Sequence, residues 1–142
     1  MVQLAATFSV LAAMFNAVVA TPLNQNVPAK RAGEVTHSGQ ATYFEVGLGA
    51  CGHTDSNSYP VVAISSQIYG SGGNCNQWLH ITNKDNGHTA YGQVRDECPG
   101  CGEYSIDLSP SLFTSLASGG LNEGVLPNIQ WNYEPVGFSP PN

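Results

Sequence analysis

The sequence predicts a mainly β domain that contains one short helix. Six short segments have the character of strands, and turns rich in Gly, Asn and Ser separate them. Only the segment that begins at Pro110 has the apolar spacing of an amphipathic helix. Six short strands with so little helix favour a closed barrel or a sandwich. Residues 32–142 are enough for one hydrophobic core and too few for two.

The predicted strands lie at residues 40–44, 61–65, 78–83, 89–94, 105–108 and 125–134. The fifth has the clearest pattern, because polar and apolar residues alternate strictly from Ser105 to Ser109. Such alternation places Ile106 and Leu108 in the core and Asp107 in solvent or in a groove. The Asp107 carboxylate is therefore available for chemistry.

Two tryptophans fall in predicted strands. Trp131 shares a face with the apolar residues of its strand, so we expect it in the core. Trp78 is out of phase with Leu79 and Ile81, which makes it the better candidate for an exposed ring that stacks on a sugar. A position at the rim under a loop is the alternative for Trp78.

The helix is predicted over residues 110–117. Ser109 has the residue type of an N-cap, and proline is favoured at the first helical position. An apolar stripe follows, formed by Leu112, Phe113 and Leu116. Gly119-Gly120 then ends the helix.

The N-terminal segment predicts secretion. Residues 2–20 carry no charged side chain and are mostly apolar, and Ala20 suits a signal-peptidase site. Residues 21–31 are polar and end in Lys30-Arg31, a pair that a furin-like protease could cut. We therefore expect a signal peptide over 1–20, a propeptide over 21–31 and a mature extracellular domain over 32–142. The alternatives are an uncleaved membrane anchor and an ordinary disordered leader with a chance basic pair.

The charge of the predicted mature domain narrows the choice of partner. The full chain has a formal net charge of −6. From residue 32 onward, the two basic residues Lys84 and Arg95 stand against ten acidic residues, which gives −8. This balance excludes nucleic acid, which requires clustered Lys and Arg, and disfavours anionic membranes and polymers. A neutral polymer, or a cationic one such as partly deacetylated chitin, fits the charge.

All four cysteines lie in the predicted mature region: Cys51, Cys75, Cys98 and Cys101. Two disulfides are expected in a secreted chain, and the sequence alone allows three connectivities. The Cys98-Pro99-Gly100-Cys101 tract could instead be a redox pair, but no βαβ pattern surrounds it. Zinc binding through this tract and His80 or His88 would need free thiolates and four matched ligands. We therefore expect no metal and no cofactor.

The region from Val94 to Pro110 resembles the end of the first domain of expansins. Expansins and the single-domain fungal loosenins carry a D-[LM]-S tract after a loop that contains cysteine or tyrosine, as in Asp107-Leu108-Ser109. Two further family tracts precede it in the expected order: Ala41-Thr42-Tyr43-Phe44 and Gly49-Ala50-Cys51-Gly52. The resemblance spans residues 39–134 and implies a six-stranded double-psi β-barrel. The sequence stops where a two-domain expansin continues into a cellulose-binding β-sandwich, so the loosenin branch is favoured.

The resemblance also implies roles for two carboxylates. Asp107 matches the general acid of family 45 glycoside hydrolases, an aspartate that expansins require for wall loosening. Asp96 matches an aspartate of bacterial expansins, eleven residues before the first. Glycosidic cleavage uses such a pair about 5 to 9.5 Å apart. The alternative for Asp96 is a loop carboxylate that caps the turn through Cys98 or pairs with Arg95.

The remaining candidate contacts lie near the first strand. Thr42 and Tyr43 match groove residues of the family, and Thr42 could orient Asp107 through a hydrogen bond, although strand propensity also explains a threonine there. Tyr43-Phe44-Glu45 can be aligned with the Y-W-D tract associated with the base of the hydrolases. An alignment that keeps Thr42 in register with the family places Val46, rather than Glu45, at the position of the aspartate of that tract. Glu45 is therefore either a substrate contact or a solvated residue at a strand end.

The disulfide pairing follows from a second resemblance. The chain is similar to barwin, whose first disulfide joins positions that match Cys51 and Cys75. This similarity implies that Cys98 and Cys101 pair locally.

The sequence thus predicts a secreted, monomeric, loosenin-like protein that binds cellulose or chitin and loosens its packing without substantial hydrolysis. One alternative is a weak endoglucanase or lytic transglycosylase that uses the same groove. Another is a non-enzymatic binding protein, such as a protease inhibitor or a host-interaction effector.

Overall fold

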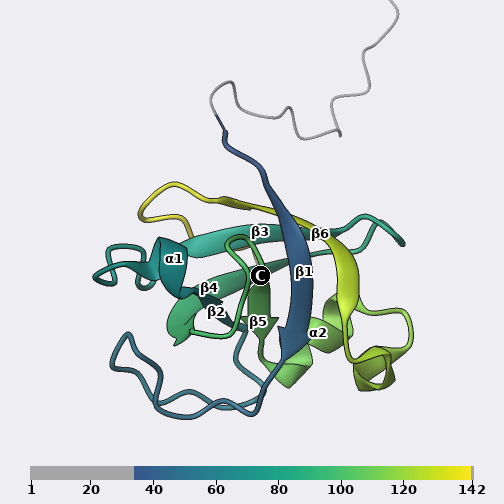
Figure 1. The fold of residues 1–142 in the computed structure, drawn as a ribbon, viewed down its shortest axis with the longest axis horizontal. Coiled ribbons are helices and arrows are strands. Elements are labelled where there is room, and N and C mark those ends of the chain that lie inside the picture. The colour runs from purple at the N-terminus through teal and green to yellow at the C-terminus, as the bar shows by residue number, and fades with distance from the viewer. Residues whose placement is uncertain (1–33, 142) are drawn as a thin grey trace, which may run out of the picture. The chain divides into compact units, whose positions relative to one another are not determined.

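A computed structural model of the protein describes residues 34–141. Six strands close into a barrel (Figure 1), so the predicted mainly β, six-stranded barrel is confirmed. The elements are β1 (His37–Tyr43), β2 (Val61–Ser65), α1 (Ser66–Tyr69), β3 (Trp78–Asn83), β4 (Thr89–Cys98), β5 (Ile106–Leu108), α2 (Pro110–Leu116), the 3-10 helix η1 (Gly120–Glu123) and β6 (Leu126–Tyr133). The predicted signal peptide (1–20) and propeptide (21–31) lie outside the described residues.

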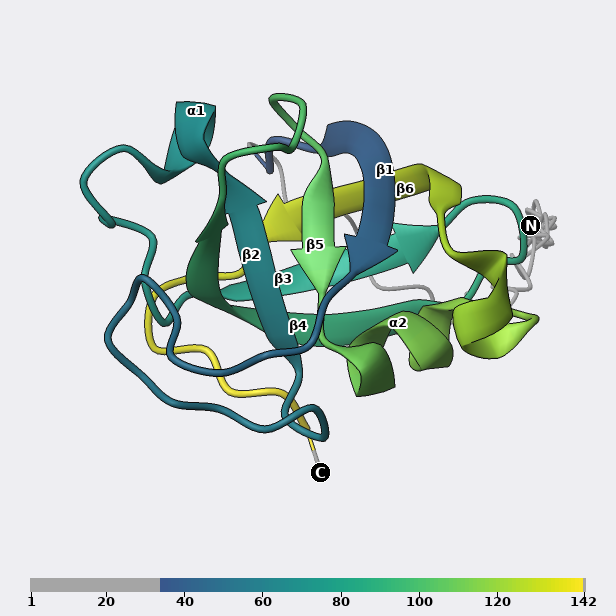
Figure 2. The ribbon, with the colours of Figure 1, turned by 60° about the horizontal axis from the view of Figure 1, so that its bottom comes forward.

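The strand order around the barrel is β1-β5-β2-β4-β3-β6. The β1–β5 and β2–β4 pairs are parallel, and the other four pairs are antiparallel. Figure 2 shows the short strand β5 between β1 and β2. Because closure gives every strand two neighbours, even a strand of three residues is held firmly on both sides.

One apolar core fills the barrel, and α2 covers one side of it (Figure 2). The helix buries the three apolar residues of its predicted stripe, Leu112, Phe113 and Leu116. Gly92 of β4 makes the close approach possible, because a Cβ there would collide with Leu112 and Val62. Trp131 is 1 % exposed, as expected from its strand pattern.

Three local predictions need correction. Strand β4 was expected to end at Val94 but continues to Cys98, because its last residues pair in parallel with β2. The four-residue helix α1 was not predicted; its N-cap is Ser65, whose hydroxyl accepts a hydrogen bond from the Gln67 N–H. Ser109 occupies the N-cap position of α2 without a capping bond, and its hydroxyl instead accepts from the Val61 N–H at 3.1 Å.

Two disulfides join Cys51 to Cys75 and Cys98 to Cys101, the pairing that the similarity to barwin implies. The first ties the loop between β1 and β2 to the loop before β3, and the second bridges the end of β4 and the following turn. Within residues 34–141, no helix has the length and apolar character needed to cross a bilayer.

Candidate functional site

A row of small and polar side chains crosses four neighbouring strands on the outside of the barrel. The strand register places Thr42 of β1 opposite Asp107 of β5, Asp107 opposite Ala63 of β2, and Ala63 opposite Asp96 of β4. The residues before and after Thr42, Ala63 and Asp107 point inward, since side chains alternate along a strand. We call Thr42, Asp107, Ala63 and Asp96 the carboxylate row.

A β-bulge gives Asp96 its place in this row. On β2, Val62 pairs with Val94, but the next residue, Ala63, pairs with Asp96, so Arg95 is an extra residue in β4. Val94 is buried in the core, and without the bulge the residue two positions later would also point inward. The extra residue reverses this alternation and turns Asp96 outward.

Asp107 is partly buried and held by its neighbours. Thr42 Oγ1 donates a hydrogen bond of 2.8 Å to Asp107 Oδ1, as the sequence suggested it could. Burial raises the pKa of Asp107, and the nearby charge of Asp96 raises it further; the hydrogen bonds from Thr42 and from the Leu108 backbone act in the opposite direction. The net shift is upward, which lets this carboxyl hold a proton at higher pH than a solvated aspartate.

Asp96 is held by the loop between β1 and β2. Its Oδ1 accepts hydrogen bonds of 2.8 Å from the backbone N–H groups of Ala50 and Glu97. Gly49 brings this loop close, because a Cβ there would collide with the carbonyl oxygen of Arg95. The sequence singled out the Gly49–Gly52 tract by resemblance; its physical role is to dock the loop on β4 and orient Asp96.

Arg95 does not pair with Asp96, which was one of the alternatives. Its Nε lies 3.6 Å from Asp55 Oδ2, and its guanidinium stacks on Tyr59 with Cζ 5.2 Å from the ring centre. The Tyr59 hydroxyl donates to Gln93 Oε1 at 2.6 Å. This cluster fixes the bulge beside the carboxylate row. Tyr59 and Asp55 were not identified from the sequence, because nothing local links them to β4.

The other candidate residues lie apart from the row. Tyr43 follows Thr42 and so points to the opposite face of β1, where its ring packs against Phe113 with 5.0 Å between centres. Glu45 is exposed and accepts a hydrogen bond from the side chain of Asn57. Trp78 is partly exposed on β3, opposite Gln93 of β4. The structure therefore brings together Thr42, Asp107 and Asp96 only.

Ala63 is the member of the carboxylate row that was not identified from the sequence. Its side chain points outward between two carboxylates and yet is only 3 % exposed. A small apolar residue carries no chemical signal in a sequence. Its place becomes evident only from the register of β2 with β4 and β5.

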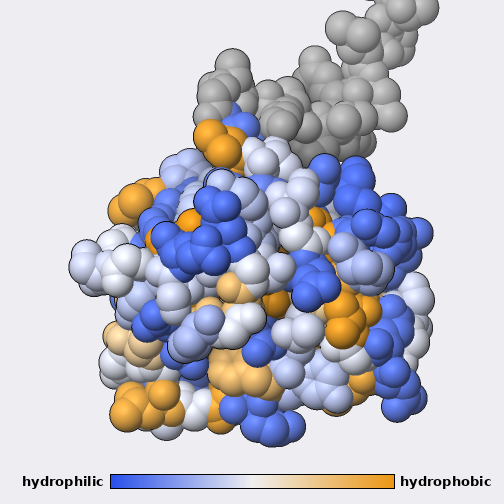
Figure 3. Space-filling model, viewed as in Figure 1, coloured by the Kyte–Doolittle hydropathy of each residue, from blue (hydrophilic) through white to orange (hydrophobic). Residues whose placement is uncertain are grey.

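The face of the molecule on which β1 lies is mixed in character. Figure 3, which views the molecule from the same side as Figure 1, shows polar and apolar residues interspersed without one large apolar area. The row can accept hydrogen bonds through its carboxylate oxygens, and a protonated Asp107 can also donate one. Such an arrangement suits a ligand rich in hydroxyl groups.

Comparison with known proteins finds relatives that share this barrel. No family model matches the sequence. The papain inhibitor of Streptomyces mobaraensis is 33 % identical over 139 residues, which cover 93 % of this chain and 92 % of the inhibitor. The solved structure of the Streptomyces papain inhibitor covers 70 % of this chain and 94 % of its own, with 30 % identity and a TM-score of 0.57.

Two further structures share the barrel. A mutant expansin of Clavibacter michiganensis in complex with cellohexaose is 27 % identical, with a TM-score of 0.64, over 75 % of this chain and 54 % of the expansin. This chain therefore spans about half of that expansin. Cerato-platanin, a fungal elicitor, is 18 % identical with a TM-score of 0.50 and shows the fold alone. The chain belongs to the family of the Streptomyces papain inhibitor and has the double-psi β-barrel that this inhibitor shares with expansins.

Proposed function

We propose that this protein is secreted, binds a β-1,4-linked wall polysaccharide, cellulose or chitin, along the carboxylate row, and loosens its packing without substantial hydrolysis. The observation that carries the proposal is the Thr42–Asp107 hydrogen bond in line with Asp96 across four strands. The complex of the related expansin with cellohexaose supports the substrate class. The two disulfides suit an extracellular protein.

The acidic residues support binding to an uncharged polymer. Sugar hydroxyls can donate to Asp96 and Asp107, and the raised pKa of Asp107 lets its carboxyl donate in return. The excess of acidic over basic residues repels polyanions such as nucleic acid. Chitin and cellulose meet both conditions.

The arrangement of the carboxylates argues against efficient hydrolysis. Asp96 and Asp107 lie two strands apart, with β2 between them. One Asp96 oxygen already accepts two backbone hydrogen bonds. Glu45, the other candidate base, is bonded to Asn57. No carboxylate is therefore well placed to activate water.

A pull-down on cellulose, chitin and xylan, with a reducing-sugar assay of the supernatant, tests this proposal. We expect binding and dispersal of cellulose or chitin fibres without new reducing ends, and loss of dispersal in Asp107→Asn. Asp85→Asn is the matched control, since Asp85 is an exposed acid outside the row. Sustained release of oligosaccharides, abolished by both Asp107→Asn and Glu45→Gln, would instead identify a hydrolase.

Protease inhibition is the second candidate function, and the similarity to the papain inhibitor over 93 % of this chain favours it. The loop of residues 46–57 is held by the Cys51–Cys75 disulfide and by its bonds to β4, and a loop fixed in this way is preorganised for contact with a protease. Titration of papain with the purified protein tests this function. Inhibition that survives Asp107→Asn, without polysaccharide binding, would favour the inhibitor.

A further inference from the structure

A strip of aromatic rings lies on the outer surface of β3 and β4, away from the carboxylate row. His80 of β3 pairs with Tyr91 of β4, and their ring centres are 5.1 Å apart. Tyr91 in turn lies 5.1 Å from Phe138. Trp78 is two residues before His80 and so points to the same side, about 6.6 Å along the strand. We call Trp78, His80, Tyr91 and Phe138 the aromatic face.

The C-terminal segment after β6 contributes one ring to this face. The Phe138 N–H donates to the Pro135 carbonyl, and Gly137 has a φ of 86°, which together form a turn of the type that favours glycine. After β6 the chain runs back beside β4, below it in the view of Figure 2. Phe138 is thereby placed on Tyr91, so the aromatic face continues beyond the barrel strands.

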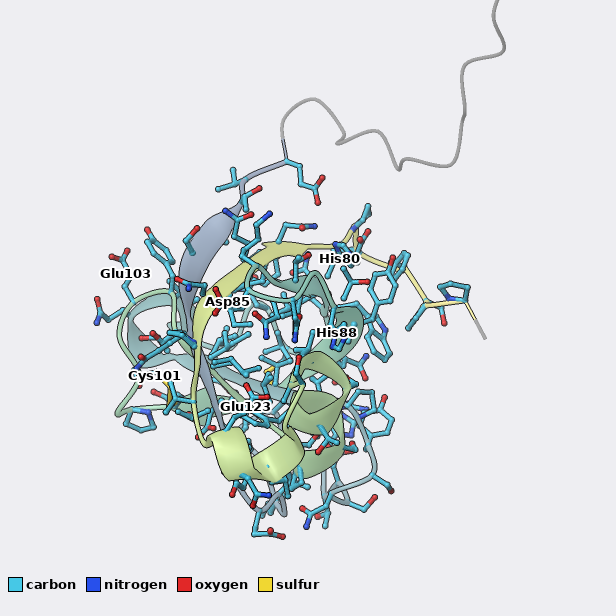
Figure 4. The ribbon with its side chains drawn as sticks, turned by 90° about the vertical axis from the view of Figure 1, so that its right-hand side faces the viewer. His80, Asp85, His88, Cys101, Glu103 and Glu123 are labelled. Carbon is cyan, nitrogen blue, oxygen red and sulfur yellow. A yellow bond between two sulfur atoms is a disulfide. The ribbon has the colours of Figure 1, made fainter. Side chains whose placement is uncertain are left out.

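The aromatic face is distinct from the carboxylate row. Tyr91 precedes Asp96 by five residues on β4, one of which is the bulge residue Arg95, so the two positions lie about 13 Å apart along the strand. The cluster of Arg95, Tyr59 and Gln93 lies between them. Figure 4 shows His80 on the opposite side of that view from Cys101, which is bridged to the end of β4.

The chemistry of the face fits a neutral polymer. None of its four side chains carries a fixed charge, in a domain with a large excess of acidic residues. All four rings are partly exposed. Partly exposed aromatic rings without a fixed charge are suited to stacking on the apolar face of a sugar ring.

We propose that the aromatic face is a second binding surface for the same uncharged β-1,4-linked polysaccharide, independent of the carboxylate row. This inference rests on the proposed function. Two surfaces at separate places on the outer side of the barrel can bind two chains of a fibre at once. A protein that holds two neighbouring chains can disturb their packing without cleaving either one, and joined contacts raise the overall avidity.

Tryptophan fluorescence offers a specific test, because Trp131 is buried and Trp78 is accessible to a quencher. We expect cellohexaose or chitohexaose to protect Trp78 from acrylamide quenching in the wild type and in Asp107→Asn. Tyr91→Leu, which keeps an apolar side chain against Phe138, should weaken the apparent affinity by about 3- to 10-fold. Tyr104→Leu is the matched control, since Tyr104 is 37 % exposed and lies outside the face. Thermal unfolding confirms that each variant is folded.

The outcomes separate this inference from the proposed function. Protection that Asp107→Asn abolishes and Tyr91→Leu leaves intact would overturn the aromatic face and support the row. Sugar binding at the row without any protection of Trp78 would also overturn the face. Protection of Trp78 that Tyr91→Leu weakens, together with fibre dispersal that is unchanged in Asp107→Asn, would support the aromatic face and contradict the proposed function. Absence of binding to either sugar would overturn both.

Discussion

The two disulfides should differ sharply in what they contribute to stability. Cys51 and Cys75 are 24 residues apart, whereas Cys98 and Cys101 are three apart. Loop-closure entropy gives about 3.4 kcal/mol for the first disulfide and about 1.6 kcal/mol for the second. For a domain of this size, about 4 °C of melting temperature corresponds to each kcal/mol. The Cys51→Ala/Cys75→Ala variant should therefore melt about 14 °C lower, and Cys98→Ala/Cys101→Ala about 6 °C lower.

The loss of polysaccharide binding in these two variants should not be proportional to their loss of thermal stability. The first disulfide holds the loop that donates the Ala50 N–H to Asp96, and the second closes the turn that follows β4. Both variants should therefore bind polysaccharide less well, although the second keeps most of its stability. Calorimetry and fibre pull-down on the two variants measure both effects. Equal melting temperatures for the two variants, or a larger loss for Cys98→Ala/Cys101→Ala, would refute the entropic reasoning.

Three further predictions concern the site and the processing of the chain. Because the pKa of Asp107 is raised in the folded protein, its ionisation opposes folding: this cost is absent below the unfolded pKa of about 4 and appears as the pH rises through the folded pKa. In denaturant unfolding, Asp107→Asn should thus be more stable than the wild type at pH 7 and equally stable at pH 3. The same difference in unfolding free energy at both pH values would contradict the raised pKa of Asp107. Gly49→Ala should displace the loop from Asp96 and weaken polysaccharide binding, while Gly47→Ala, where a Cβ meets no atom within 4 Å, should not; equal effects on binding would remove the proposed role of Gly49. Intact mass of the secreted protein should correspond to a start at Ala32 with two disulfides, and a start at Thr21 would disprove the propeptide.

The parts of the fold that could be predicted from the sequence are those determined by the local spacing of polar and apolar residues. Strict alternation around Asp107 was enough to place Ile106 and Leu108 in the core, because a strand imposes a period of two. The apolar stripe of α2 was equally local. The closed topology was not local, and composition left both a barrel and a sandwich possible. Only the resemblance to expansins selected the double-psi barrel.

The parts that could not be predicted depend on pairing between distant segments. The bulge at Arg95 exists only in the register of β4 with β2, so the sequence could name Asp96 but not its outward direction. The Ser109 hydroxyl bonds to Val61, which is 48 residues away, and local rules assigned it to the helix instead. Tyr43 and Thr42 were grouped by resemblance, although alternation along β1 separates them.

Polysaccharide binding at the carboxylate row can be tested directly by a chemical-shift titration of the isotopically labelled protein with cellohexaose and with chitohexaose. We expect one of these sugars to shift the resonances of Thr42, Ala63, Asp96 and Asp107 together, and Asp107→Asn, unlike Asp85→Asn, to weaken this response. Shifts confined to the loop of residues 46–57 on addition of papain, with no response of the carboxylate row to either sugar, would contradict binding at the row.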